Sequence, residues 1–124
     1  MDKEYFGWHE FDLAVAGLAL EIKRSKRHLE GVFGIPRGGW VVAVALGHLL
    51  GLPLLKHWEI PNETTLVVDD ISDSGFTLEP FKLVAATIAT IHVVKGTKVV
   101  PDFFAKYRDG NWVVYPWEYE PVQL

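Results

Sequence analysis

The chain has 124 residues, a net charge of −4 and 49% hydrophobic residues. This size suits one domain with one hydrophobic core, and no repeat or linker divides it, so we expect a single domain over residues 1–124. No apolar run is long enough to span a bilayer, and residues 1–4 lack the layout of a signal peptide, which predicts a soluble, cytoplasmic protein. The absence of cysteine excludes disulfides and cysteine-type zinc sites, and the negative charge argues against a general nucleic-acid binder.

Residues from Trp8 to about Lys26 carry apolar side chains every third or fourth position, which predicts an amphipathic helix. The basic residues at its end, 23–28, could bind phosphates or nucleic acid. Cations are also favourable at the carboxyl end of a helix, and we favour this interpretation of a solvated helix end.

The rest of the sequence alternates between strand-like and helix-like segments. The predicted segments are a strand at Gly31–Ile35, a tight loop at Pro36–Gly39, a helix at Trp40–Leu50 ended by Gly51, a strand at Pro53–His57, a strand at Thr65–Asp69, a short helix from about Leu78, and a strand at Thr87–Val94. Such alternation predicts an α/β fold with an open, mostly parallel sheet flanked by helices. Ligands of these sheets bind beyond the carboxyl ends of the strands, where we expect the loops to converge on one crevice.

The segment Thr64–Thr77 is an apolar strand that runs into acids, hydroxyls and glycine. Consecutive strand residues point to opposite sides, so Asp69 and Asp70 cannot both lie in the core. The residues after them suit a phosphate cradle, with hydroxyls and close backbone approach at Ser72, Ser74, Gly75 and Thr77. The alternative is an ordinary strand-to-helix turn, but a helix cap needs only one such residue.

Within this segment, Val67–Thr77 closely resembles the phosphoribosyl pyrophosphate motif of type I phosphoribosyltransferases. The resemblance implies that family's fold, with a core at about residues 28–96 and a small C-terminal base-binding hood at about 97–124. It also implies that Asp69 and Asp70 hold ribose hydroxyls and Mg²⁺, and that Asp73 is the general base. The residues implied to hold the 5′-phosphate are Ser72, Ser74, Gly75, Phe76 through its backbone N–H, and Thr77.

The loop Gly34–Gly39 places a guanidinium beside two glycines. Main-chain N–H groups and the forked cation of Arg37 can hold a pyrophosphate together. In the family this loop binds pyrophosphate, which implies that role for Arg37, Gly38 and Gly39, with Arg37 stabilising the leaving group. A Pro-Gly turn with a surface arginine remains the alternative.

The last third of the chain resembles the end of the xanthine-guanine phosphoribosyltransferases. The resemblance implies that Lys95, at the end of a strand, faces the 6-oxo group of a purine and that Trp112 stacks on the ring. Ile71 and Val113 complete the implied base site. A snorkelling surface lysine and an ordinary core aromatic are the alternatives for Lys95 and Trp112. We assign the pair Trp117–Glu118 mostly to packing, and we interpret the remaining tryptophans as structural, namely Trp8, Trp40 and Trp58.

The resemblance implies a magnesium-dependent glycosyltransferase of purine salvage. Its substrates are phosphoribosyl pyrophosphate and a 6-oxopurine (guanine, xanthine or hypoxanthine), its products are the purine nucleoside monophosphate and pyrophosphate, and homodimers are common in the family. The family usually inserts a long mobile lid before the motif strand, whereas only residues 58–63 separate His57 from Thr64 here. A shortened lid leaves open slow turnover, closure by a partner subunit, or a non-catalytic sensor of nucleotides or phosphoribosyl pyrophosphate.

Overall fold

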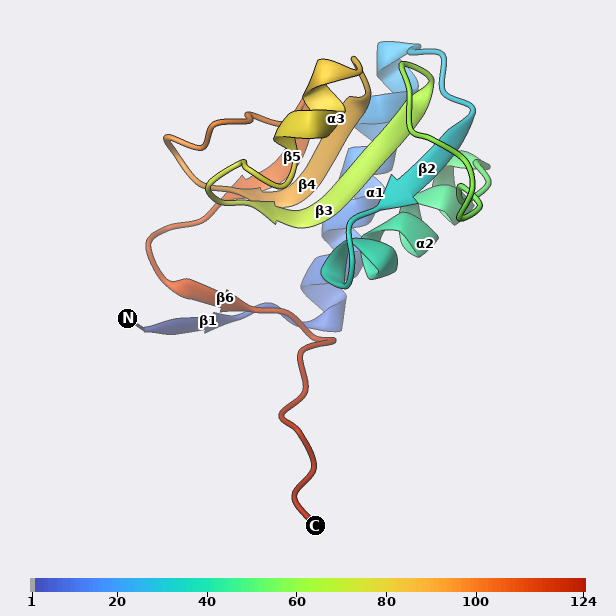
Figure 1. Cartoon of the computed structure of the whole chain (residues 1–124). Coiled ribbons are helices and arrows are strands. Elements are labelled where there is room, and N and C mark those ends of the chain that lie inside the picture. The colour runs from blue at the N-terminus through green and yellow to red at the C-terminus, as the bar shows by residue number, and fades with distance from the viewer. Residues whose placement is uncertain (1) are drawn as a thin grey trace.

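The computed structural model describes residues 2–124. Its elements are, in chain order, β1 (Lys3–Tyr5), α1 (Trp8–Ser25), β2 (Gly31–Gly34), α2 (Gly38–Leu50), β3 (Thr65–Ser72), α3 (Glu79–Leu83), β4 (Thr87–Val93), β5 (Phe103–Tyr107) and β6 (Trp112–Val114). The main sheet has the order β2-β3-β4-β5, and a small separate sheet pairs β1 with β6 (Figure 1). Every strand pair is parallel, as the alternation of elements predicted.

Helices cover both faces of the main sheet. On one face α1 and α2 enclose the larger core, and on the other α3 covers a smaller one (Figure 1). Leu66 and Val68 of β3 belong to the larger core and Val67 to the smaller one. The prediction of a helix-flanked sheet is therefore confirmed, and β3 is buried on both sides as its apolar sequence indicated.

The first predicted helix is confirmed. Its buried face consists of Phe11, Val15, Leu18, Ala19 and Ile22. The interpretation of its basic end as solvated is confirmed, since residues 23–28 are all exposed, and within it the Arg27 guanidinium donates a hydrogen bond to Thr87 Oγ1 (3.2 Å) and pairs with Asp102 (3.5 Å). Within residues 2–124, no helix combines the length and the apolar character that a membrane crossing requires.

Two predicted elements differ in extent or kind. The segment Pro53–His57 is not a strand, because it makes only one bridge to β2, at Leu54, before the chain turns back at Lys56. In contrast, β3 does not stop at its acids but continues to Ser72, because the ladder to β4 continues past Asp69. The acids therefore lie within a paired strand, where the backbone fixes their direction.

Three short strands escaped the sequence prediction. Strand β5 forms an edge of the main sheet, and β1 and β6 have only three residues each, too few for a periodic pattern.

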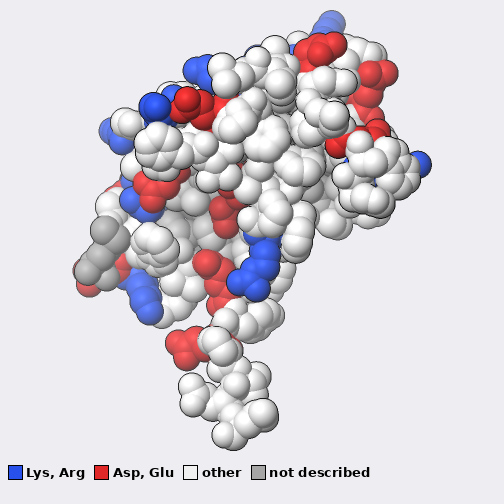
Figure 2. Space-filling view, viewed as in Figure 1, with Lys and Arg blue, Asp and Glu red and all other residues white. Residues whose placement is uncertain are grey.

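The tryptophans interpreted as structural are largely exposed, with Trp8 at 50%, Trp40 at 53% and Trp58 at 66%. Scattered acidic and basic side chains lie among uncharged ones on the face seen in Figure 2, where the described residues form no continuous basic surface.

Candidate functional site

The predicted phosphate-cradle residues surround one cavity, which we call the cradle cavity. It has a volume of about 90 Å³ and lies between the end of β3 and the start of α3. Its lining consists of Asp69, Ile71, Ser72, Asp73, Ser74, Gly75, Thr77 and Leu78. Phe76 is 67% exposed and is not part of the lining, and its backbone N–H donates to Ser74 Oγ (3.3 Å).

The cradle loop is held against the segment that follows β4. Gly75 has a φ of 89°, and a Cβ there would lie 2.8 Å from Thr97 Oγ1, so both the conformation and the space require glycine. Lys98 donates its N–H to the Ser74 carbonyl (2.9 Å). The Ser72 side chain is buried and donates to the Val99 carbonyl (2.7 Å). Its hydroxyl therefore holds the loop in place, while Ser72 also lines the cradle cavity, and its contact with a phosphate stays a prediction.

A second cavity, of about 720 Å³, lies on the other side of β3, and we call it the Arg37 cavity. Its lining consists of Arg37, Gly38, Trp40, Val41, Asp70, Trp117, Glu118 and Tyr119. Gly39 is buried behind it, where a Cβ would lie 2.7 Å from the Val68 carbonyl oxygen. The loops thus line two cavities, one at Asp69 and the other at Asp70, because alternate residues of β3 point to opposite faces.

Asp69 lines the cradle cavity and Asp70 lines the Arg37 cavity, so the two acids lie between the cavities. Asp70 donates its N–H to Asp69 Oδ1 (2.8 Å), and Ile71 donates its N–H to Asp70 Oδ1 (2.8 Å). Burial raises the pKa of both carboxyl groups, and the charge of Asp70 further raises the pKa of Asp69, to about 8. The negative charge of Glu118 adds to the rise at Asp70. Neither carboxylate has a cationic partner among the ion pairs of residues 2–124.

This pair of acids suits a hard divalent cation, which would offset their repulsion. No group of three or more potential metal-ligating acids or histidines exists among residues 2–124. The protein could therefore offer one or two carboxylates, with the remaining ligands drawn from water or substrate phosphates. That donor set is the common one for Mg²⁺.

The predicted base-binding residues lie apart from both cavities, except Ile71, which lines the cradle cavity. The Lys95 ammonium lies 5.4 Å from the centre of the Tyr107 ring. The Trp112 side chain is 52% exposed, so it is not the core aromatic of the alternative interpretation. The Val113 side chain is buried in the larger core, which leaves only its backbone for contact with a base.

The sequence interpretation missed three residues near these sites. Trp117 packs against the larger core, as assigned, but it also lines the Arg37 cavity together with Glu118. The Glu118 carboxylate accepts a hydrogen bond from the Tyr115 N–H (2.7 Å). Arg108 lies 3.4 Å from the Asp73 carboxylate. Glu118 lies in the last third of the chain, whose resemblance to the xanthine-guanine phosphoribosyltransferases was a signal for it. Arg108 had no such signal, because the strand that precedes it, β5, was not predicted.

The raised pKa of Asp69 leads to a prediction for Asp69→Asn. Between about pH 4 and 8 the unfolded chain loses this proton while the folded chain retains it, so wild-type stability falls as the pH rises through that window. The amide removes this cost. We expect the variant to melt about 5 °C or more above the wild type at pH 9 and to lose this advantage near pH 4. Thermal unfolding across pH measures this.

Asp12→Asn, on the exposed side of α1, is the control for removal of one negative charge from the chain. A difference in melting temperature between wild type and Asp69→Asn that stays constant from pH 4 to pH 9 would contradict the assignment.

The chain is similar to known proteins in sequence and in fold. No protein-family model matches the chain. It is 33% identical to a purine phosphoribosyltransferase from Pyrococcus horikoshii Ot3, with 100% of this chain and 99% of that one covered and a TM-score of 0.80. A Helicobacter pylori xanthine-guanine-hypoxanthine phosphoribosyltransferase has the same fold, with a TM-score of 0.78 at 21% identity over 94% of this chain and 93% of that one.

Among curated proteins, the xanthine-guanine phosphoribosyltransferase of Desulfotalea psychrophila is 26% identical in an alignment that covers 77% of this chain and 74% of that protein. The match to the Pyrococcus horikoshii protein covers both chains almost completely, and its identity of 33% is high enough to indicate common ancestry. This chain therefore belongs to the type I purine phosphoribosyltransferase family.

Proposed function

We propose that this chain transfers ribose 5-phosphate from phosphoribosyl pyrophosphate to a ring nitrogen of guanine, xanthine or hypoxanthine. The bond between the ribose carbon and pyrophosphate breaks, and the bond to the purine nitrogen forms. The observation that carries this proposal is the cradle cavity, in which the phosphate-motif residues meet at the end of β3. The relatives named above act on purines, which supports the substrate class.

The two cavities fit the two ends of the sugar substrate. The cradle cavity would take the 5′-phosphate through Ser74, the backbone of Gly75 and Phe76, and Thr77. On the other side of β3, Arg37 and the backbone of Gly38 and Gly39 would hold the departing pyrophosphate, where a guanidinium can stabilise the charge that develops. Asp69 and Asp70, between them, would hold the ribose hydroxyls.

Asp73 is the proposed proton acceptor. Its carboxylate lines the cradle cavity and is 53% exposed, so it is open to a base that approaches the sugar. A purine nitrogen that attacks the sugar carbon must lose a proton, and a nearby carboxylate can accept it. On the base itself, Lys95 would select the 6-oxo group and Trp112 would stack on the ring.

Magnesium dependence is part of the proposal. The cation would neutralise pyrophosphate as it leaves. Asp69 and Asp70 would hold it, directly or through water, and the pKa values that burial raises indicate a site that favours a bound cation. The retention of Asp73 and Arg37, which serve the chemistry, argues for an enzyme over a sensor despite the short segment in place of the lid.

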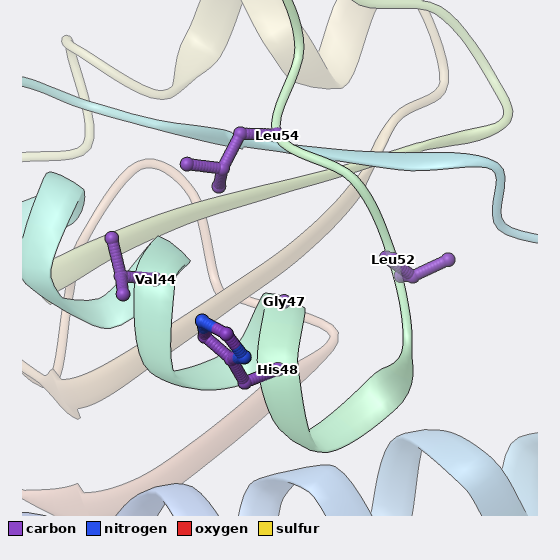
Figure 3. A pocket seen from close by; sticks show the side chains of 5 residues that line it. All are labelled: Val44, Gly47, His48, Leu52 and Leu54. Atoms are coloured by element: carbon purple, nitrogen blue, oxygen red, sulfur yellow. The ribbon is translucent and has the colours of Figure 1, made fainter.

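We further propose that the chain forms a homodimer through the outer side of α2. This helix contains no acidic residue and no lysine or arginine, yet Trp40, Val44 and Leu49 on it are 44% to 53% exposed. Two hollows meet at Val44. One lies towards Trp40. The other lies towards Leu54 and is shown in Figure 3. An apolar helix face of this kind is typical of a surface that another protein covers.

A turnover assay tests the function directly. Wild-type protein with phosphoribosyl pyrophosphate and Mg²⁺ should convert guanine, xanthine or hypoxanthine to the nucleotide and leave adenine unchanged, and a chelator should abolish the reaction. Calorimetric binding of the product nucleotides runs in parallel. Tight nucleotide binding without turnover would contradict the transferase and leave the sensor.

Lys95→Ala tests the selection of the base. Without the ammonium, the preference for 6-oxopurines over adenine should fall about tenfold or more, because a site that binds the oxo group directly loses that partner. The ratio of kcat/KM values for hypoxanthine and adenine measures it. Lys106→Ala is the control, because it removes a lysine of the edge strand β5 that pairs with Glu4 of β1 (3.5 Å). Unchanged discrimination in Lys95→Ala would remove Lys95 from the base site.

Val44→Arg tests the homodimer. A charge in the middle of the apolar side of α2 should convert the dimer to a monomer in sedimentation velocity, because burying it unpaired is costly. Leu13→Arg, at a side chain of α1 that is 63% exposed, is the matched control and should stay dimeric. A monomeric wild type would refute the dimer, and a dimeric Val44→Arg would refute this face.

A further inference from the structure

Arg108, which follows β5, lies between Asp73 of the cradle loop and the Trp112 ring of β6. Its Nη1 lies 3.4 Å from Asp73 Oδ2, and its guanidinium carbon lies 5.9 Å from the centre of the Trp112 ring. The Arg108 side chain is only 14% exposed, whereas that of Asp73 is 53% exposed. The arginine is therefore the fixed partner of the two, held from behind while the carboxylate faces the cavity.

The backbone of Arg108 is tied to the strand ends that carry the site. Its N–H donates to the Val93 carbonyl at the end of β4 (3.0 Å). The next residue of that segment, Val94, donates its N–H to the Ser72 carbonyl (2.9 Å), directly before Asp73. Hydrogen bonds thus join the backbone of Arg108 to the end of β4, which leads to Lys95, and join the end of β4 to the end of β3, which leads to Asp73.

Of the three acids in the phosphoribosyl pyrophosphate motif, only Asp73 has a cationic partner among the ion pairs of residues 2–124. Asp69 and Asp70 have none. The chain therefore provides a cation of its own for the proposed proton acceptor, and leaves the two acids proposed to hold Mg²⁺ without one.

A guanidinium suits this place because it is planar. It can lie against an aromatic ring through its face and donate hydrogen bonds through its edge, which an ammonium cannot do in the same way. We propose that Arg108 is a positioning residue of the base site, which fixes the Asp73 carboxylate relative to the Trp112 ring. This inference rests on the proposed function.

The consequence concerns the geometry of the reaction. Trp112 would set the plane of the base and Asp73 would accept its proton, so the two must be placed correctly with respect to each other. Misplacement of reacting groups by about 1 Å can cost about a hundredfold in rate. Arg108 contacts both side chains, and therefore couples the binding of the base to the removal of its proton.

Arg27 offers a matched control within the same chain. Its guanidinium also pairs with an aspartate, Asp102 (3.5 Å), and also lies over an aromatic ring, Phe103 (5.3 Å). Asp102 precedes β5 and Arg108 follows it, so the two arginines lie at opposite ends of that strand. Arg27→Gln therefore removes the same interactions away from the proposed site.

The experiment compares Arg108→Gln, Arg108→Lys and Arg27→Gln with the wild type. Arg108→Gln should lower kcat about tenfold or more and raise the KM for the base about fivefold, with the KM for phosphoribosyl pyrophosphate within about twofold. Arg108→Lys should recover much of kcat, because an ammonium can pair with Asp73, but not the KM for the base. Arg27→Gln should leave all three parameters within about twofold, and thermal unfolding of each variant verifies that it is folded.

A double-mutant cycle with Asp73→Asn isolates the route. If Arg108 acts on kcat through Asp73, Arg108→Gln should lower kcat no further in the Asp73→Asn background. Wild-type kinetics in Arg108→Gln, or an equal loss in Arg108→Gln and Arg27→Gln, would overturn the positioning role and leave the transferase intact. Absence of turnover in the wild type would instead overturn the proposed function, and this inference with it.

Discussion

The two-sided burial of β3 is the constraint on which the rest of the structure depends. Leu66 and Val68 enter the core beneath α1 and α2, and Val67 enters the core beneath α3. The same alternation carries on into the acids, so Asp70 opens to the Arg37 cavity and Asp69 to the cradle cavity. A strand that supplies one carboxylate to each side suits a substrate with a phosphate at one end and a pyrophosphate at the other.

This arrangement has an electrostatic cost. The strand that anchors the fold also removes two neighbouring carboxyl groups from water, and burial raises the pKa of both. The folded chain without ligand therefore holds a site that is stabilised by whatever brings positive charge to it. Sites of this kind trade stability for function, and the unpaired acids of β3 lie where the proposed cation and sugar would compensate them.

The sequence predicted the central part of the fold well, because it depends on local patterns. The amphipathic spacing of α1 predicts one buried face, and the apolar run at the start of β3 predicts a strand that is buried on both faces. The prediction of a strand at Pro53–His57 was wrong, because a strand-like composition does not guarantee a strand to pair with. The role of Arg108 could not be predicted, since its contacts join residues 35 positions apart through an edge strand without a clear pattern.

The position of the C-terminal segment that the sequence predicts as a hood depends on contacts of the same long-range kind. The Tyr115 hydroxyl donates to the Asp70 carbonyl (3.2 Å) and lies 2.8 Å from His92 Nδ1, while its ring stacks on Trp117 at 5.0 Å. Burial raises the pKa of Tyr115 and lowers that of His92 to about 4, so both stay neutral near pH 7. This link adds no charge beside the acids, yet it ties the backbone of Asp70 to the segment that carries Trp117 and Glu118. Movement of the hood would therefore displace the wall of the Arg37 cavity and the Asp70 backbone together.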